Sequence, residues 1–171
     1  MTLPYYGFEK VALSINHADH QFGHYRRWLR AQRADADALL GPGNALPTPE
    51  YALSTCQQAW RTRCPEELYP TRWVTDQTMA LMREFHASAR PFFIQCSFPD
   101  PHHPFTPPGK YWDMYRPEDM TLPDSFHGEH RHAPPHLRWM WAQRDGGRAI
   151  KHTPAPFACN EREAQIGRAH V

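Results

Sequence analysis

The sequence lacks the features that mark several common classes of protein. No apolar run approaches the roughly 20 residues that a membrane-spanning helix needs, and the N-terminus has neither the basic nor the apolar region of a signal peptide. The 19 basic and 18 acidic residues are intermixed and leave a net charge of +1, so no basic patch of the kind that binds nucleic acid is present. We therefore expect neither a membrane nor a nucleic acid as partner, and the cellular compartment stays open.

Cysteine is scarce, and its spacing is uninformative. The sequence has no Cys-x-x-Cys pair, the spacing typical of redox and zinc sites. The four cysteines are Cys56, Cys64, Cys96 and Cys159. We favour four free thiols over the alternative of a disulfide between Cys56 and Cys64.

Length and proline content set the expected architecture. With 171 residues and 40% hydrophobic content, the chain is long enough for one ordinary domain. Its 18 prolines fall mostly after residue 90, at about twice the average usage. We therefore predict long irregular connections in the second half.

Hydrophobic periodicity predicts one strand and two helices before residue 91. Residues 8–15 alternate in the manner of a half-buried strand. An amphipathic helix is predicted from Tyr25 to about Leu40, and a second from Thr75 or Asp76 to about Arg90. Pro91 then ends the second helix.

The stretch 91–108 joins an apolar run to a cluster of polar groups. Residues 92–98 are rich in β-formers and predict a buried strand, which is followed by Asp100, His102 and His103 among prolines. The carboxyl ends of strands in open α/β sheets are where ligands bind. Histidine suits acid–base work or anion binding there. On spacing alone, hydrogen-bonded loop histidines explain the pattern equally well.

These residues resemble a known family. Residues 92–108 read Phe-Phe-Ile-Gln-Cys-Ser-Phe-Pro-Asp-Pro-His-His-Pro-Phe-Thr-Pro-Pro, and Lys-Tyr-Trp-Asp-Met-Tyr follows at 110–115. The stretch resembles the middle of type I sulfatases, in which a strand leads to Pro-His-x-Pro and then to Lys-Tyr with further aromatics. Gly7-Phe8-Glu9 is similar to the family's Gly-Phe-Asp element, and Glu161-Arg162-Glu163-Ala164 to the start of a later helix. The resemblance covers most of residues 4–164.

The resemblance implies a fold and a reaction. The fold is α/β, a partial alkaline-phosphatase/sulfatase-like sandwich with a central mixed sheet and a loop-rich second half. The reaction is hydrolysis of a small-molecule or carbohydrate sulfate ester by a formylglycine nucleophile and a divalent cation, usually calcium. His102 matches the family's catalytic histidine, which contacts the sulfate and is often assigned the proton given to the leaving alcohol; His102 and His103 together are the implied substrate-binding residues. A phosphonate or phosphate ester hydrolase of the same superfamily remains the alternative.

The departures from the family pattern concern the reacting groups themselves. The sequence has no Cys or Ser-x-Pro-x-Arg motif, from which formylglycine is made, and lacks the family's paired aspartates, its Gly-Lys-Trp-His segment and its downstream Asp-Asn or Asp-His pair. We therefore expect residues 1–165 to be an internal fragment of a sulfatase catalytic domain, inactive alone, with no residue present that binds calcium. Predicted strands without neighbours also predict poor solubility or partial folding.

The last six residues, 166–171, are expected to be non-native. They read Ile-Gly-Arg-Ala-His-Val, which resembles the translation of a widely used sequencing adapter whose next in-frame triplet is a stop codon. Such a tail is set aside from reasoning about the fold. Underlying nucleotides without the adapter bases would refute this interpretation.

Other histidines support a competing hypothesis of a non-catalytic, histidine-rich metal-binding module. His17, His20 and His24 stand at i, i+3 and i+7 and, with Asp19, would share a face of a helix that could bind zinc. Because Gly23 interrupts that helix, we favour solvated loop histidines. The same holds for a second cluster, formed by His127, His130, His132 and His136.

Overall fold

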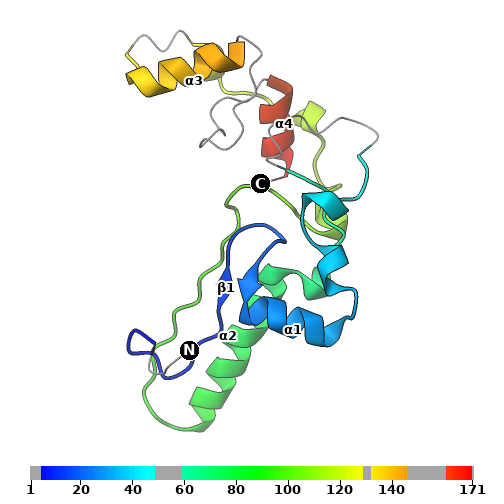
Figure 1. Ribbon diagram of the computed structural model, residues 1–171. Coiled ribbons are helices and arrows are strands. Elements are labelled where there is room, and N and C mark those ends of the chain that lie inside the picture. The colour runs from blue at the N-terminus through cyan, green and yellow to red at the C-terminus, as the bar shows by residue number, and fades with distance from the viewer. Residues whose placement is uncertain (1–4, 49–58, 129–131, 146–160, 171) are drawn as a thin grey trace. The chain divides into compact units, whose positions relative to one another are not determined.

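The structure, a computed structural model, describes residues 5–48, 59–128, 132–145 and 161–170. Within these ranges the chain consists of helices and one two-stranded sheet (Figure 1). It divides into two compact units, which are described separately. Unit 1 is Met1–Ala45 with Thr62–His103, and unit 2 is Leu46–Arg61 with Pro104–Val171. This mixture of helix and small sheet is compatible with the predicted α/β class.

Unit 1 contains the sheet and the helices α1 and α2. Strands β1 (Ser14–Ile15) and β2 (Phe22–Gly23) pair antiparallel, with Ser14 opposite Gly23. The hairpin leads directly into α1. The helical elements of the unit are α1 (His24–Gln32), η1 (Ala36–Leu39), η2 (Pro42–Asn44), η3 (Glu66–Leu68) and α2 (Pro70–Ala87).

The predicted helices of unit 1 form, with different ends. The first predicted helix is α1 followed by the short η1, because the chain leaves the helix at Arg33, which has an extended backbone. The second begins at Pro70, several residues before the predicted start. Proline suits the first turn of a helix because its missing N–H is not needed there. Thr75 and Asp76 thus lie inside α2 and are not caps.

Aromatic side chains from α1 and α2 build the core of unit 1. Tyr25 and Leu29 are fully buried, and Trp73 is 3% exposed. The rings of Tyr25 and Trp73 meet edge to face with their centroids 5.8 Å apart. The Tyr25 hydroxyl donates a hydrogen bond to the Leu68 carbonyl over 3.0 Å, so burial of this ring leaves its polar end satisfied.

Unit 2 joins its helices by irregular connections and short 3₁₀ turns, in keeping with the proline content of the second half of the sequence. Its helical elements are η4 (Gly109–Tyr111), η5 (Pro117–Asp119), η6 (Asp124–His127), α3 (Pro135–Asp145) and α4 (Glu161–Ala169). A small core joins Ala59, Trp112 and Ile166, with Phe105 packed against it. Residues 166–169 thus form the end of α4, and Ile166, Ala169 and His170 are buried; the non-native origin of residues 166–171 stays a prediction about the nucleotides.

The two predicted strands are largely absent, which corrects the sequence prediction. Of residues 8–15 only Ser14 and Ile15 form a strand, and their partner is β2, in a segment predicted to be a loop. Residues 92–98 form no strand. A β-strand needs a neighbour to satisfy its backbone groups, and the backbone of residues 91–98 makes no backbone hydrogen bond with any described residue. The alkaline-phosphatase-like sheet therefore stays a prediction.

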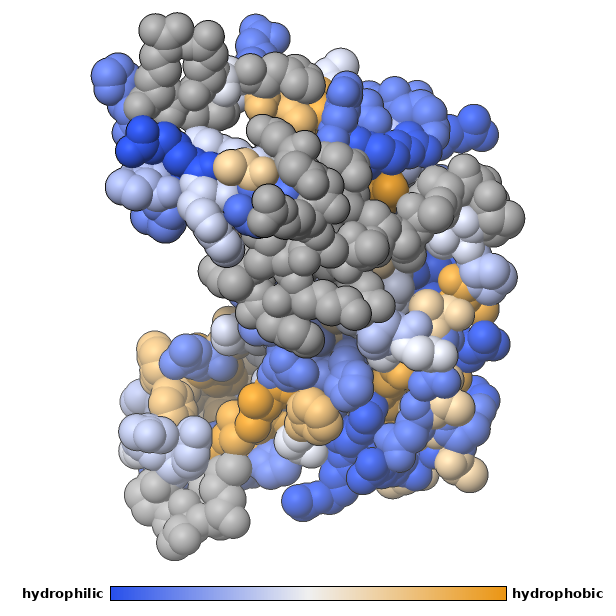
Figure 2. Space-filling model, turned by 45° about the horizontal axis from the view of Figure 1, so that its top comes forward, coloured by the Kyte–Doolittle hydropathy of each residue, from blue (hydrophilic) through white to orange (hydrophobic). Residues whose placement is uncertain are grey.

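Unit 1 contains an apolar groove of about 850 Å³ beside residues 92–98, for which a strand was predicted. Its walls are residues 5–17, one face of α2 and residues 90–99. Phe85 of α2 packs against Phe92 of the segment 90–99, with ring centroids 5.6 Å apart. An ion pair joins Lys10, in the segment 5–17, to Glu84 of α2. In Figure 2 apolar residues show as orange patches around a hollow in the lower part of the view. Phe93 is 75% exposed.

Two further predictions concern cysteine and membranes. Cys64 and Cys96 are free thiols, as favoured, while Cys56 and Cys159 lie outside the described residues. Burial raises the pKa of the Cys64 thiol to about 12, so this thiol stays protonated and unreactive at neutral pH. No helix in the described ranges has the length and hydrophobicity needed to cross a bilayer.

We predict that Phe93→Ser raises the soluble concentration of the chain, because it removes an exposed apolar ring from the groove without removing a core contact. Ultracentrifugation of matched lysates would measure the effect. The control is Trp73→Ser in the buried wall of the same groove, which should cost about 3–5 kcal/mol and abolish the helical circular dichroism signal. Equal solubility of Phe93→Ser and wild type would contradict the prediction.

Candidate functional site

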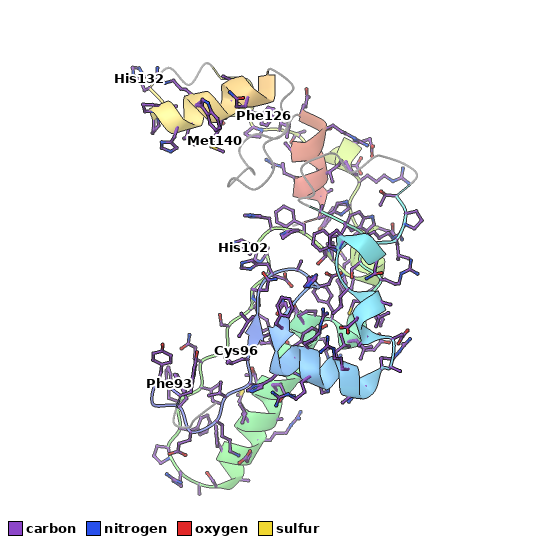
Figure 3. All side chains as sticks on the ribbon, in the orientation of Figure 1. Phe93, Cys96, His102, Phe126, His132 and Met140 are labelled. Carbon is purple, nitrogen blue, oxygen red and sulfur yellow. The ribbon has the colours of Figure 1, made fainter. Side chains whose placement is uncertain are left out.

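His102 and His103 lie on a tight turn that follows the extended segment 91–99. Figure 3 shows His102 on this connection, with Phe93 and Cys96 earlier along it. The His102 N–H donates to the Pro99 carbonyl over 3.0 Å and closes the turn. Pro101 and Pro104 restrict the backbone on either side, because proline fixes φ. The main-chain position of both histidines is thus well defined.

The hydrogen bond of the His102 ring selects its tautomer. Nδ1 of His102 lies 2.6 Å from the carbonyl oxygen of His103. Because a carbonyl oxygen only accepts, Nδ1 must carry the proton of this bond, and in the neutral ring Nε2 is then the basic nitrogen. Protonation at Nε2 creates an N–H that can hold an anion or deliver a proton. His102 is also exposed, so a ligand can reach it.

Asp100 supplies a carboxyl group beside the histidines. Its Oδ2 accepts a hydrogen bond from the Thr71 hydroxyl, in the first turn of α2, over 2.6 Å. Burial raises the pKa of Asp100, and the Thr71 hydrogen bond and the nearby His17 act in the opposite direction. The carboxyl is therefore poised between burial, which favours its neutral form, and donors, which favour the carboxylate.

The structure adds His17 to the predicted pair. The rings of His17 and His102 stack with centroids 3.7 Å apart and an interplanar angle of 8°. His103 stacks on the His102 ring in turn, with centroids 4.4 Å apart. The three imidazoles come from two segments that are distant in sequence, the turn after β1 and the turn after residue 99. His102 makes both stacking contacts in the cluster.

The turn that carries His17 has an unusual backbone. Asn16 and Ala18, the residues on either side of His17, have φ angles of 91° and 59°. Asparagine adopts the left-handed region readily, whereas alanine there costs roughly 1–2 kcal/mol. Hydrogen bonds hold this conformation, because the Asn16 amide donates to the His20 carbonyl and the Gln21 amide donates to the Ala18 carbonyl.

Asp19 fixes the same turn to the rest of unit 1. Its side chain is fully buried. Oδ1 accepts the Gly41 N–H over 3.0 Å, and Oδ2 accepts the Thr62 hydroxyl. A buried carboxylate is tolerated because such donors replace its hydration. The position of His17 therefore depends on contacts with two other parts of the unit.

Burial and proximity keep the outer imidazoles neutral. The pKa of His17 lies below its usual value because of burial and the neighbouring His102, although Asp100 opposes the shift. The pKa of His103 is lowered by burial, by His102 and by His17. At neutral pH both rings are therefore neutral. Such a cluster can bind a tetrahedral oxyanion through N–H donors, which become more numerous as the pH falls.

The rings of the predicted residues His102 and His103 stack on each other. The structure adds the contact between His17 and His102, which the sequence did not predict. The sequence allowed a zinc set of His17, His20, His24 and Asp19 but favoured loop histidines, and in the structure the side chains of this set have separate partners. His24 Nδ1 accepts the Leu13 N–H, and His20 packs near Phe22. Asp19 holds the turn through its hydrogen bonds to Gly41 and Thr62. The sequence indicates this role only by an acidic residue within a polar turn. Of the second histidine cluster, His130 lies outside the described residues.

The described residues do not form a metal site. No group of three or more His, Cys, Asp or Glu side chains in the described ranges is arranged to hold a metal ion. Asp19, a hard oxygen donor suited to calcium, already accepts hydrogen bonds with both oxygens. Within the described ranges, therefore, no set of side chains fits a calcium ion.

Comparison with known proteins gives partial matches. The chain is 43% identical over 58 residues to an arylsulfatase of Clostridium perfringens (strain 13 / Type A), a match covering 34% of this chain and 12% of that protein. It is 30% identical over 100 residues to the uncharacterized sulfatase YidJ of Escherichia coli (strain K12), covering 56% of this chain and 20% of that protein. It is 36% identical over 58 residues to human iduronate 2-sulfatase, covering 34% and 10%.

These matches span between 10% and 20% of the length of the curated relatives. No protein-family model matches the sequence, and no solved structure matches it significantly.

We predict that Asp19→Ala lowers the free energy of unfolding by about 3 kcal/mol, because it leaves the buried Gly41 and Thr62 donors without an acceptor. Urea unfolding at low protein concentration, followed by tryptophan fluorescence, measures this. Asp35→Ala is the matched control, since Asp35 forms an exposed ion pair with Arg33 and such pairs contribute little. Equal effects of both substitutions would contradict the role of Asp19.

We also predict that Thr71→Val raises the pKa of Asp100 further, because the lost hydroxyl stabilises the carboxylate form. Carbon-13 detection of the aspartate carboxyl groups during a pH titration gives the measurement. Thr75→Val, one turn along α2, serves as control because its hydroxyl donates to the Thr71 carbonyl. A pKa of Asp100 that stays the same or falls in Thr71→Val would refute the assignment.

Proposed function

The chain is homologous to sulfatases over part of its length, and on that premise we propose that it is an internal segment of a sulfuric ester hydrolase. The hydrolase cleaves sulfate monoesters of a small molecule or carbohydrate. Within it, His102 contacts the sulfate group and gives a proton to the leaving alcohol, and His103 helps to bind the substrate. The proposal combines the homology with the position of these histidines.

The observation that carries the proposal is the orientation of His102. Its Nδ1 donates to the His103 carbonyl, so Nε2 is the basic nitrogen of the neutral ring and the one that can accept and give up a further proton. A general acid needs a nitrogen that gains and loses a proton near neutral pH within reach of the leaving oxygen. A hydrogen bond that fixes the opposite nitrogen keeps the ring in the tautomer that this transfer requires.

The remaining groups of the reaction would come from outside this sequence. In the proposed parent enzyme a formylglycine supplies the nucleophile, and a divalent cation, usually calcium, neutralises charge on the transferred group. The nucleophile motif is missing from the sequence, and no cluster among the described residues is arranged to hold a metal. Accordingly, the 171-residue chain alone is inactive.

We predict that the purified 171-residue chain does not hydrolyse aryl sulfates, because it lacks the nucleophile. A chromogenic aryl sulfate with added calcium measures this. The genomic DNA on either side should encode Cys or Ser-x-Pro-x-Arg upstream and Asp-Asn or Asp-His downstream. Turnover by the chain alone, or flanking DNA that lacks both motifs, would contradict the proposal.

In the longer protein encoded there, His102→Ala should lower kcat for an aryl sulfate by roughly 10²–10⁴-fold, the range typical of a lost general acid. His86→Ala, an exposed histidine on α2, is the control and should leave kcat unchanged. Assays with aryl phosphate and phosphonate esters distinguish the alternative, because a phosphoryl hydrolase would prefer those substrates. An unchanged kcat in His102→Ala would exclude the proposed role.

A further inference from the structure

The His17 imidazole faces the proposed sulfate site, and no role has been assigned to it. Its ring lies parallel to that of His102, with centroids 3.7 Å apart and an angle of 8° between the planes. Its Nδ1 is buried and has no hydrogen-bond partner in the described structure. A buried polar atom without a partner is uncommon and calls for an explanation.

Two features of the fold place this ring where it is. Left-handed backbone at Asn16 and Ala18 turns the chain sharply on both sides of His17. The buried Asp19 carboxylate, which follows directly, joins this turn to Gly41 and Thr62. Strained backbone conformations persist only when the surrounding structure imposes them, and they gather at functional sites.

We propose that His17 is a positioning residue of the oxyanion site: its ring holds the His102 ring by stacking, so that His102 meets a tetrahedral oxyanion in one orientation. This inference rests on the proposed function, because it assigns His17 to the sulfate site of His102. His17 acts through His102 and does not itself transfer a proton.

The charges around the cluster support this role. His17 is faced by His102, by His103 and by the carboxyl of Asp100. Two stacked imidazolium rings would repel each other, so one ring of the stack must stay neutral when the other is charged. Burial lowers the pKa of His17, which favours His17 as the neutral ring of the stack.

The stack also restricts motion of an exposed side chain. His102 lies on the surface, and the bond from Nδ1 to the His103 carbonyl is the one hydrogen bond of its ring to the described residues. That bond alone allows the ring plane to tilt. Rings on either side, His17 and His103, define the plane, and pre-ordering of a binding group lowers the entropy lost when a ligand binds.

The test uses the 171-residue chain and sodium sulfate, with sodium chloride at equal ionic strength as reference. Proton–carbon NMR of the histidine rings reports two quantities, the ring-current shift of His102 and its response to sulfate. In wild type we expect an upfield-shifted His102 ring that responds to sulfate and not to chloride. His17→Ala should abolish the upfield shift and weaken the apparent sulfate affinity about fivefold.

Two variants separate positioning from general stability. His17→Phe keeps an aromatic ring for stacking without the ring nitrogens, so it should restore the His102 shift and most of the sulfate affinity. His20→Ala lies in the same turn but packs near Phe22, and it should behave as wild type. If His17→Ala does not fold, the comparison of His17→Phe with wild type still decides.

The outcomes distinguish the two proposals. If wild-type His102 does not respond to sulfate, the proposal that His102 binds sulfate is wrong. If, in that case, the upfield shift is still lost in His17→Ala and restored in His17→Phe, then His17 positions the His102 ring but the ring does not bind sulfate. If wild type binds sulfate and His17→Ala leaves both the shift and the affinity unchanged, the inference about His17 is wrong. Failure of His17→Phe to restore the shift would likewise overturn it.

Discussion

The buried carboxylate of Asp19 is the contact on which the candidate site depends. It is fully buried and accepts hydrogen bonds from the Gly41 backbone and the Thr62 hydroxyl. Those two donors lie in segments that flank the region 46–61, so Asp19 ties the β1–β2 hairpin to both. Without these donors the cost of burying the charge would be several kcal/mol. Because His17 precedes Asp19 by two residues, the same contact fixes where its ring lies.

The proposed chemistry depends on Asp19 through His17 and then His102. The fixed turn presents His17 to His102, and the turn after Pro99 presents His102 with its Nδ1 engaged. Asp100, held by Thr71, adds a carboxyl whose pKa burial raises. Each histidine alone is an ordinary loop residue. Their arrangement as a stack beside a carboxyl makes them suitable for holding an oxyanion and exchanging a proton.

The sequence predicted those parts of the structure that depend on local pattern. Helical periodicity located α1 and α2, and the motif around His102 indicated the resemblance to sulfatases. The sequence did not predict contacts between distant segments. Nothing local to His17 indicates that its ring contacts that of His102. An aspartate among polar residues, such as Asp19, indicates a turn whether or not its side chain is buried. For residues 92–98 the sequence predicted a strand that the structure does not contain. Their composition favours a strand, but a strand exists only with a hydrogen-bonded neighbour, and no described residue provides one.

The account is tested most directly by a nuclear Overhauser experiment on the wild-type chain. It asks whether ring protons of His17 and His102 lie within about 5 Å of each other, as rings stacked at van der Waals separation must. The account predicts a strong cross-peak between the two rings and none between His20 and His102. A folded chain with no cross-peak between His17 and His102 would contradict it, because the two turns would then not form one site.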